Sequence, residues 1–319
     1  MNYYSIVPHQ VIDVRGDLDS ENLDWSVTHM GLDKLVYKGE GQLVGVLDTG
    51  CDVAHPDLQG QVDTHNFISA AGDAIGDRSH GTFVCSQIVG KSDGKGIVGA
   101  APKAKVYHGK VLYGTSSDMN RRSIDGDIAD GIYACVAAGC NVISMSLGGP
   151  SFSTMMCGAI DYAENQGVIV VCAAGNERLQ GSPYKSYPAA CFGAVSVAAA
   201  NKQDMPAWFS TTGVNGATEK EQPEVAIASQ EFYWGCLPDG RYGRMIGTSM
   251  AAPTLAAVAT LWYEARTTKG TLPAGALVLD SFREWLHRVS DDVNNNGWDP
   301  ELGYGTLLLS DEELSTFGD

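Results

Sequence analysis

The feature that most constrains the fold is a series of short apolar segments separated by helical patterns. Residues 43–47 are apolar without alternation and end at Asp48, which is typical of a strand covered on both faces. Strand-like segments follow at residues 106–112, 142–147, 168–173 and 194–198. Apolar side chains recur at helical spacing in residues 127–138 and 154–165. This alternation predicts an α/β fold with a mainly parallel central sheet and helices on both faces.

Composition narrows the class of protein. With 319 residues and 44% hydrophobic content, the chain can form one large domain or two small ones, and we expect one main domain. Its net charge of −17 argues against nucleic acid or an anionic membrane as a partner. The start of the chain resembles no secretory signal, and no apolar stretch is long enough to cross a membrane. We expect buried thiols and a cytoplasmic location, since no Cys-x-x-Cys pair occurs among Cys51, Cys85, Cys135, Cys140, Cys157, Cys172, Cys191 and Cys236.

Three side chains suited to nucleophilic catalysis stand at ends of predicted elements. Asp48 ends a buried strand, His80 opens a predicted helix, and Ser249 precedes the apolar run 255–262. Pro253 fits the first turn of that last helix, where an amide hydrogen has no partner. Taken singly, these residues are as easily a turn, a structural histidine and a helix cap. Their order, acid then base then serine, is one of the known orders of a catalytic triad.

The motifs in this order resemble those of the subtilisin-like serine peptidases, the subtilases. The resemblance spans residues 25–309 and rests on residues 46–52, 55–58, 79–82, 143–151, 173–177, 186–190 and 247–253. It implies a three-layer subtilisin-like fold and an endopeptidase in which Ser249 attacks, His80 transfers protons and Asp48 orients the imidazole. It also implies that Asn176 binds the oxyanion. Where the family commonly has His-Val-Ala-Gly after residue 82, this chain has Phe83 to Ser86, so local packing is expected to differ.

The resemblance also assigns the substrate cleft. Leu147, Gly148 and Gly149 would pair with the backbone of a peptide or unfolded protein substrate. The opposite wall of the primary pocket would consist of Ala173, Ala174 and Gly175, with Ser186 near its floor. Small residues on all sides predict broad specificity, with a preference for a large apolar residue before the scissile bond.

Two loops could hold structural Ca²⁺. The resemblance places Asp57 at a calcium site, together with carbonyls of residues 92–96, although that loop departs from the family's asparagine-rich form. The second loop has oxygen-bearing residues at alternate positions before a glycine, as an EF-hand loop begins. Its candidate ligands are Asp292, Asn294, Asn296 and Asp299. Gly303 stands where the closing acid belongs, so an ordinary polar turn is the alternative.

The N-terminal segment is predicted to regulate the enzyme. Intracellular subtilisins, which this pattern resembles most, carry a short extension with a Leu-Ile-Pro-Tyr motif across the active site. Here Ile6, Val7, Pro8 and His9 stand in the matching place. We therefore expect residues 1–18 to form an inhibitory extension and residues 19–319 the peptidase domain, which the resemblance suggests pairs as a homodimer. The alternatives are an untethered tail, a catalytically silent binding protein of the same fold, and a secreted subtilisin that has lost its signal and prodomain.

Overall fold

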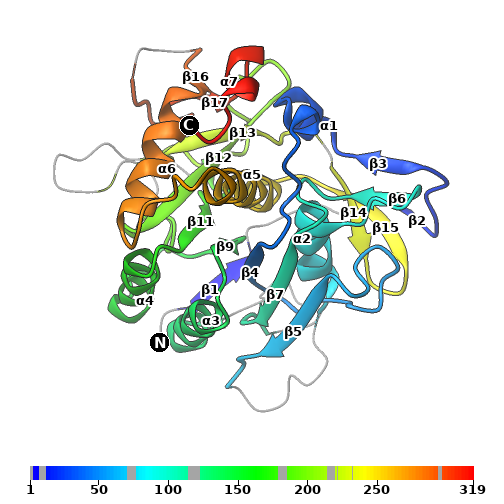
Figure 1. The fold of residues 1–319 in the computed structure, drawn as a ribbon. Helices are drawn as coiled ribbons and strands as arrows, with labels where there is room; N and C mark the ends of the chain where they lie inside the picture. The colour runs from blue at the N-terminus through cyan, green and yellow to red at the C-terminus, as the bar shows by residue number, and fades with distance from the viewer. Residues whose placement is uncertain are drawn as a thin grey trace.

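The fold is an α/β sandwich with a mainly parallel central sheet, as predicted (Figure 1), and in the described residues this sheet has nine strands. The computed structural model describes residues 3–6, 12–69, 77–113, 123–178, 185–213, 220, 222–231, 233–293 and 297–319. In spatial order the sheet consists of β16 (Ser290–Asp291), β17 (Thr306–Leu307), β13 (Val225–Ala228), β12 (Ala194–Ala200), β11 (Ile169–Ala173), β9 (Val142–Met145), β4 (Leu43–Asp48), β7 (Lys105–Lys110) and β5 (Val62–Asn66). Neighbouring strands pair in parallel except β16 with β17.

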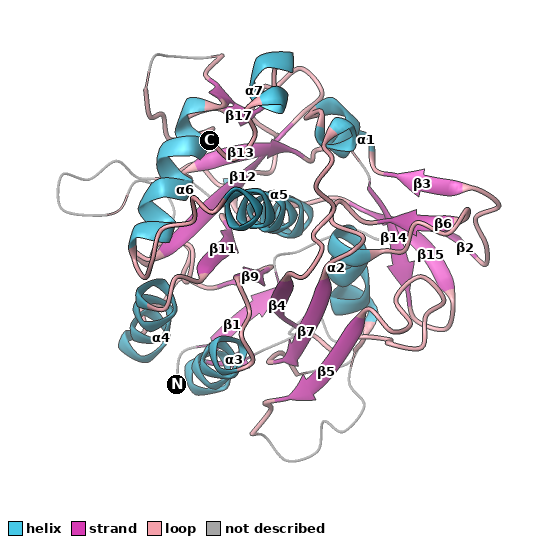
Figure 2. Cartoon of the chain, viewed as in Figure 1, coloured by secondary structure: helices cyan, strands magenta, loops and turns pink. Residues whose placement is uncertain are grey.

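Helices cover both faces of this sheet, which gives the three layers (Figure 2). One face carries α2 (Ser79–Val89), α5 (Thr248–Lys269) and α6 (Leu277–Arg288), and the other carries α3 (Asp125–Ala137) and α4 (Thr154–Asn165). Side chains of β4 alternate between the two cores: Val44 and Val46 join the first, and Leu47 joins the second. Both faces are therefore apolar, and this explains the unbroken apolar run in the sequence.

Short elements complete the described part of the chain. The helices are α1 (Trp25–His29), the 3₁₀ turn η1 (Leu32–Lys34) and α7 (Asp311–Ser315). The strands outside the main sheet are β1 (Tyr3–Ile6), β2 (Ile12–Arg15), β3 (Glu21–Leu23), β6 (Gly96–Val98), β8 (Ser123–Ile124), β10 (Leu147–Gly148), β14 (Tyr233–Leu237) and β15 (Arg241–Met245). In the described residues, no helix is both long and apolar enough to span a membrane.

The two strands before Gly16 attach to different parts of the molecule. β1 lies between β10 and β8 and is antiparallel to both. β2 adds a third, antiparallel strand to the hairpin formed by β14 and β15. Arg15 of β2 also stacks on Trp234, with 4.7 Å between the guanidinium carbon and the ring centroid. The segment before residue 18, predicted to be one unit, thus has two separate attachments.

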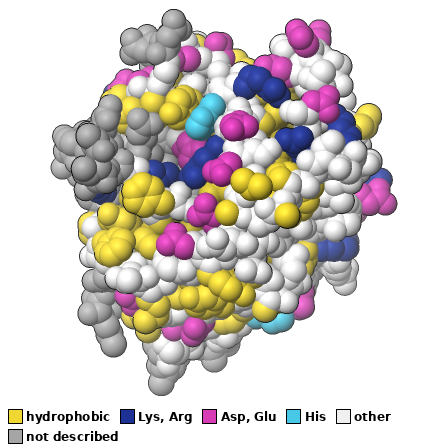
Figure 3. Space-filling model, turned by 60° about the vertical axis from the view of Figure 1, so that its left-hand side comes forward, with side chains coloured by type: hydrophobic (Ala, Val, Ile, Leu, Met, Phe, Trp, Pro, Cys, Tyr) yellow, Lys and Arg dark blue, Asp and Glu magenta, His cyan; other side chains and the backbone are white. Residues whose placement is uncertain are grey.

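A buried ion cluster fastens α6 to the start of β13. Glu224 accepts a 2.8 Å hydrogen bond from Arg283 and contacts His287 at 3.1 Å. Burial alone would raise the pKa of the Glu224 carboxyl, but Arg283, His287 and Lys220 together lower it to about 2. Figure 3 shows a face of the molecule on which basic, acidic and histidine side chains lie close together. A pocket beside the ion cluster is lined by Phe192, Lys220, Glu224, Arg283, His287 and Tyr304.

The expectation that all eight cysteines are thiols is wrong for one pair. Cys157 of α4 and Cys191, in the loop before β12, form a disulfide with 5.4 Å between their Cα atoms. The other six cysteines are free and buried. A pair 34 residues apart in sequence carries no local motif, so only the packing of α4 against that loop reveals it.

Candidate active site

The acid and the base meet at the end of the central strand. Asp48 is the last residue of β4, and His80 is the second residue of α2. His80 Nδ1 lies 2.7 Å from Asp48 Oδ1, and neither residue has any solvent-exposed surface. The backbone N–H of Thr49 donates to the same carboxylate oxygen at 2.7 Å. These bonds hold the carboxylate toward Nδ1, so Nε2 is the ring nitrogen that can accept a proton.

Ser249 lies at the N-terminus of the long buried helix α5, as predicted. It has no exposed surface, and none of the described residues forms a hydrogen bond with its Oγ. Pro253, however, is the sixth residue of α5, so placing it in the first turn was wrong. Proline has no N–H to give the carbonyl four residues earlier, which here is that of Ser249. Ser146 Oγ donates to this carbonyl instead, at 2.9 Å.

Asn176 is fixed to the same helix end. Its Oδ1 accepts hydrogen bonds from the backbone N–H and the Oγ1 hydroxyl of Thr248, both at 3.0 Å. This identifies Nδ2 as the donor end of the side-chain amide. Gly247 has a φ of +146°, and a Cβ atom there would lie 2.9 Å from Nδ2. The glycine therefore leaves the space that the amide needs beside Ser249.

The predicted substrate edge is paired with the N-terminal strand. Leu147 and Gly148 form β10, where Ile6 is opposite Leu147 and Ser5 is opposite Gly148. Gly149 exchanges backbone hydrogen bonds of 3.0 and 2.8 Å with Tyr187. A Cβ atom on Gly148 would collide with Ser186 Oγ, so these two residues face each other closely.

The remaining predicted cleft residues also lie at this edge of the sheet. Ala173 is the last residue of β11, and Ala174 is buried and donates its N–H to Val197. Gly175 follows with a φ of +111°. Of the segment predicted to inhibit, Ile6 ends β1; Val7, Pro8 and His9 lie outside the described residues.

A second histidine supports the turn after Asp48. His108 is fully buried, and its Nε2 lies 2.8 Å from the carbonyl oxygen of Thr49 while its Nδ1 lies 2.8 Å from Thr64 Oγ1. Burial lowers the pKa of His108 to about 4, although the Asp48 charge and the bond to Thr49 oppose this shift. A neutral ring is therefore the form that links β7 to the turn after Asp48.

The surroundings of Asp57 suit a hydrogen-bond acceptor better than a cation ligand. Its Oδ2 accepts from the N–H of Ile97 at 2.7 Å, and its Oδ1 accepts from the hydroxyl of Tyr242 at 3.1 Å. His55 and Cys236 lie close enough to form a metal-binding cluster with Asp57. Both ring nitrogens of His55 already have backbone partners, however, the N–H of Asp57 at 3.2 Å and the carbonyl of Arg241 at 3.1 Å.

Among the described residues of the second candidate calcium loop, Asp299 has a buried carboxylate oxygen without a donor. Asp292 Oδ2 accepts from the N–H of Gly297 at 2.8 Å. Asp299 Oδ1 accepts from the backbone N–H groups of Glu301 and Leu302 at 2.7 and 2.9 Å. Asp299 Oδ2 is buried, and in the described part of the chain no donor reaches it. Asn294 and Asn296 lie outside the described residues.

Sequence reasoning missed the residues that support the site. Ser146 stands inside a motif that we used, but its bond to the Ser249 carbonyl depends on two segments 103 residues apart. His108 looks like an ordinary strand residue in the sequence. Thr248 precedes the predicted nucleophile directly. Its hydroxyl, which bonds Asn176 Oδ1, could have been recognised from the sequence as a nearby polar group.

Comparison with known proteins shows the class to which this fold and site belong. Residues 39–305 match the model of the subtilase family, described as "Subtilase family" under the name Peptidase_S8. The chain belongs to this family. It is 38% identical to the major intracellular serine protease of Bacillus subtilis (strain 168) over 223 residues, which cover 68% of this chain and 66% of that protein.

Two further relatives match different extents of the chain. Subtilisin E of the same strain is 36% identical over 226 residues, which cover 70% of this chain and 56% of that protein. Fervidolysin of Fervidobacterium pennivorans is 32% identical over 319 residues, which cover 89% of this chain and 43% of that protein. The chain thus spans about half the length of several curated relatives that it matches.

Proposed function

We propose that the protein is a serine endopeptidase that hydrolyses peptide bonds. Ser249 Oγ attacks the scissile carbonyl while His80 Nε2 accepts its proton and then returns it to the leaving amine. Asp48 stabilises the imidazolium, and Asn176 Nδ2 with the Ser249 N–H binds the oxyanion. The observation that carries the proposal is the 2.7 Å contact between His80 Nδ1 and Asp48 Oδ1 at the same sheet edge as Asn176. The relatives named above include a serine protease and a subtilisin.

The proposed specificity is broad, with a preference for large apolar side chains. The support for this preference is that the residues assigned to the pocket walls, Gly148, Gly149, Ala173 and Ala174, all have small side chains. Ser186 Oγ lies next to Gly148, where a Cβ atom would meet it. Backbone pairing with β10 gives affinity that does not depend on substrate sequence. A peptide-library screen should show cleavage after many large apolar residues. Strict cleavage after acidic residues would contradict this.

We further propose that the N-terminal extension inhibits the enzyme in cis. β1 occupies the middle position between β10 and β8, which is how a peptide adds a strand to a cleft. Ser249 and His80 are fully buried, whereas a nucleophile that awaits substrate needs access. A chain beginning at Ile12 should hydrolyse peptides faster than the full chain. Equal rates would contradict inhibition by residues 1–11.

Mass spectrometry of the incubated full chain beside its Ser249→Ala variant tests catalysis and self-processing together. We expect the wild type to lose N-terminal residues and the variant to remain intact. Covalent labelling by a fluorophosphonate should occur on Ser249 in the wild type alone. If labelling and hydrolysis are both absent after removal of residues 1–11, the chain is a binding protein of this fold.

For Ca²⁺, we propose the loop that contains Asp299. Its buried Oδ2 is an oxygen that a cation could satisfy. If Ca²⁺ binds, it should raise the melting temperature of the wild type, and a chelator should lower it. Asp299→Asn keeps an acceptor for the amides of Glu301 and Leu302 but removes the charge. An equal calcium effect in this variant would place the ion elsewhere.

We propose a cytoplasmic location, supported by the similarity to an intracellular protease and by six buried free thiols. The Cys157–Cys191 disulfide is the exception to this pattern. Cys157 is 8% exposed and Cys191 2% exposed, so a soluble reductant has little access to the bond. Burial thus allows this one disulfide to persist in a reducing compartment.

A further inference from the structure

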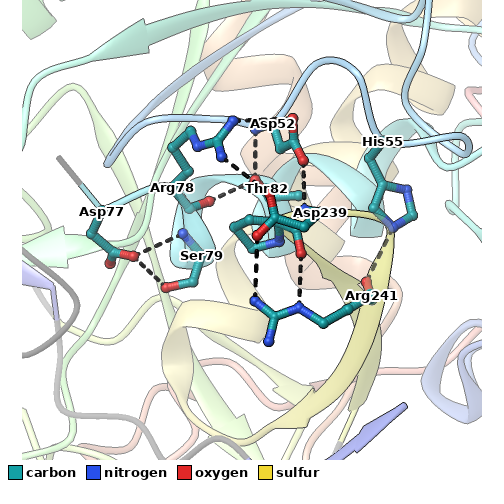
Figure 4. Close-up of polar contacts among 9 residues, drawn as sticks. Asp52, His55, Asp77, Arg78, Ser79, Thr82, Asp239 and Arg241 are labelled. Atoms are coloured by element: carbon teal, nitrogen blue, oxygen red, sulfur yellow. Dashed lines mark hydrogen bonds and ion pairs between the residues drawn. The ribbon is translucent and has the colours of Figure 1, made fainter. Parts of the chain in front are cut away.

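The loop after Asp48 and the start of the helix that carries His80 are joined twice (Figure 4). Through side chains, Arg78 Nη1 donates to Asp52 Oδ1 at 3.2 Å. Through the backbone, the N–H of Asp52 donates to Thr82 Oγ1 at 2.7 Å, and that hydroxyl donates to the carbonyl of Arg78 at 2.6 Å. The three residues therefore form a closed ring of hydrogen bonds beside the proposed acid and base.

The turn of the β14–β15 hairpin closes this ring from a third side. The N–H of Asp239 donates to Asp52 Oδ2 at 2.8 Å, and Arg78 Nη2 lies 3.5 Å from Asp239 Oδ1. Asp239 has a φ of +66°, as a tight turn requires. We refer to Asp52, Arg78, Thr82 and Asp239 as the Arg78 cluster. Both carboxylate oxygens of the largely buried Asp52 have a donor within this cluster.

The Arg78 side chain does not cap α2 and instead contacts Asp52 and Asp239. Asp77 Oδ1 accepts from the N–H and the hydroxyl of Ser79, at 2.9 and 2.5 Å. Arg78 occupies the N-cap position of α2, but its guanidinium is directed at Asp52 and Asp239. Its side chain is 37% exposed, while that of Asp52 is 9% exposed. Solvent screens the Arg78 side of this ion pair, and a glutamine in its place would still offer an N–H donor to the Asp52 carboxylate, so Arg78→Gln removes the charge with a limited cost to the fold.

We propose that Arg78 is a positioning residue for the reaction. By holding the loop after Asp48 against the first turn of α2, it keeps the His80 ring on the Asp48 carboxylate. This inference rests on the proposed function, because it assigns Arg78 a role in the same triad. A small displacement of a catalytic group can cost about a hundredfold in rate, so a contact of little value to folding can matter for turnover.

The test is Arg78→Gln in the full chain, with each preparation normalised by fluorophosphonate titration of Ser249. We expect kcat for a chromogenic peptide to fall about tenfold, with KM within about twofold and the melting temperature nearly unchanged. The low-field proton resonance of His80 Nδ1–H should shift or broaden. Arg78→Lys, which keeps the charge, should recover part of kcat.

Two controls separate positioning from general electrostatics. Arg241 also pairs with Asp239, at 3.7 Å, so Arg241→Gln removes a similar charge and should leave kcat within about twofold. Asp52→Asn added to Arg78→Gln should lower kcat little further, because both changes break the same contact.

Unchanged kcat together with an unchanged His80 resonance in Arg78→Gln would overturn the inference. A rise in KM at constant kcat would also overturn it, since Arg78 would then contact substrate. If the wild type neither hydrolyses peptides nor reacts with the fluorophosphonate, the proposed function fails. The His80 resonance of the variants still tests the positioning role in that case.

Discussion

Pro253 lacks the N–H that would bond the carbonyl of Ser249, and the hydroxyl of Ser146 bonds this carbonyl in its place. Pro253 lies in the second turn of α5, so the carbonyl of Ser249 receives no helical N–H. Ser146 supplies the donor from the end of β9, at 2.9 Å. The carbonyl of the proposed nucleophile is thereby tied to the central sheet, which restrains the position of Ser249 across two elements.

Ser146→Ala tests this exchange. The variant leaves the buried carbonyl of Ser249 without a donor, which should lower the free energy of unfolding by about 1–3 kcal/mol. Adding Pro253→Ala restores a backbone N–H at residue 253 and should recover part of that loss. Urea unfolding of the two single variants and the double variant measures the coupling. Strictly additive effects would show that the two donors do not substitute for each other.

His108 predicts a loss of stability in mild acid. Burial lowers its pKa from 6.5 to about 4 in the fold, so between these values the unfolded chain binds more protons than the folded chain. The contribution of His108 to the free energy of unfolding is fully present above pH 6.5. It decreases as the pH falls toward 4, by about 3 kcal/mol in all. Urea unfolding at pH 7.5 and pH 4.5 should show this difference.

His108→Gln isolates the effect from other titrating groups. Burial raises the pKa of Asp24 to about 7. The contribution of this carboxyl to protein stability therefore decreases as the pH rises, which is opposite to the trend of His108. The comparison of wild type with variant at each pH cancels the Asp24 contribution. An equal pH dependence in both proteins would mean that His108 is not the group responsible.

At the scale of elements, the sequence predicted the strands that are buried on both faces and missed strands that are partly exposed. Residues 43–47 and 194–198 were read as buried strands and correspond to β4 and β12, because both faces of these strands are apolar. The edge strand β5 was missed, since its sequence Val-Asp-Thr-His-Asn is mostly polar and partly exposed. The hairpin of β14 and β15 was missed as well.

The unusual Phe83 shows why such details escape a single sequence. A Cβ atom on Gly235 of β14 would lie 2.5 Å from the Phe83 ring, so the glycine makes room for this side chain. The motif departure at α2 is therefore matched by a residue about 150 positions away. Each proposed triad residue stands in a short motif that the sequence shows directly. The Arg78 cluster and the bond of Ser146 join segments that are distant in sequence, so they depend on contacts that only the fold creates.

The third strand of the hairpin gives a prediction about truncation. A chain that begins at Leu18 loses the pairing of β2 with β15 and the stacking of Arg15 on Trp234. A chain that begins at Ile12 keeps both. We expect the shorter chain to melt about 1–2 °C lower, since a loss of about 1 kcal/mol shifts the melting temperature of a chain of 319 residues by roughly that amount. Equal melting temperatures would show that β2 adds no stability.

At the scale of the whole molecule, the sheet separates two cores, and the disulfide lies on the side of α3 and α4. It connects α4 to the loop that carries Ser186 and Tyr187, and Tyr187 pairs with Gly149 of the predicted substrate-binding segment. The bond thus restrains a loop that the larger core on the opposite face does not reach. Its loss should affect the stability of this half of the molecule first.

A thiol count tests the bond and its shielding together. The chain denatured without reductant should show six thiols, and eight after reduction of the denatured chain. Native protein incubated with dithiothreitol and then alkylated should still show six, because both sulfur-bearing residues are almost completely buried. Replacing Cys157 and Cys191 by serine should cost roughly 2–4 kcal/mol of unfolding free energy. Eight thiols without reduction would mean that Cys157 and Cys191 are not bonded. All eight cysteines would then be free, as expected in a reducing compartment, and no shielding of a disulfide would need to be invoked.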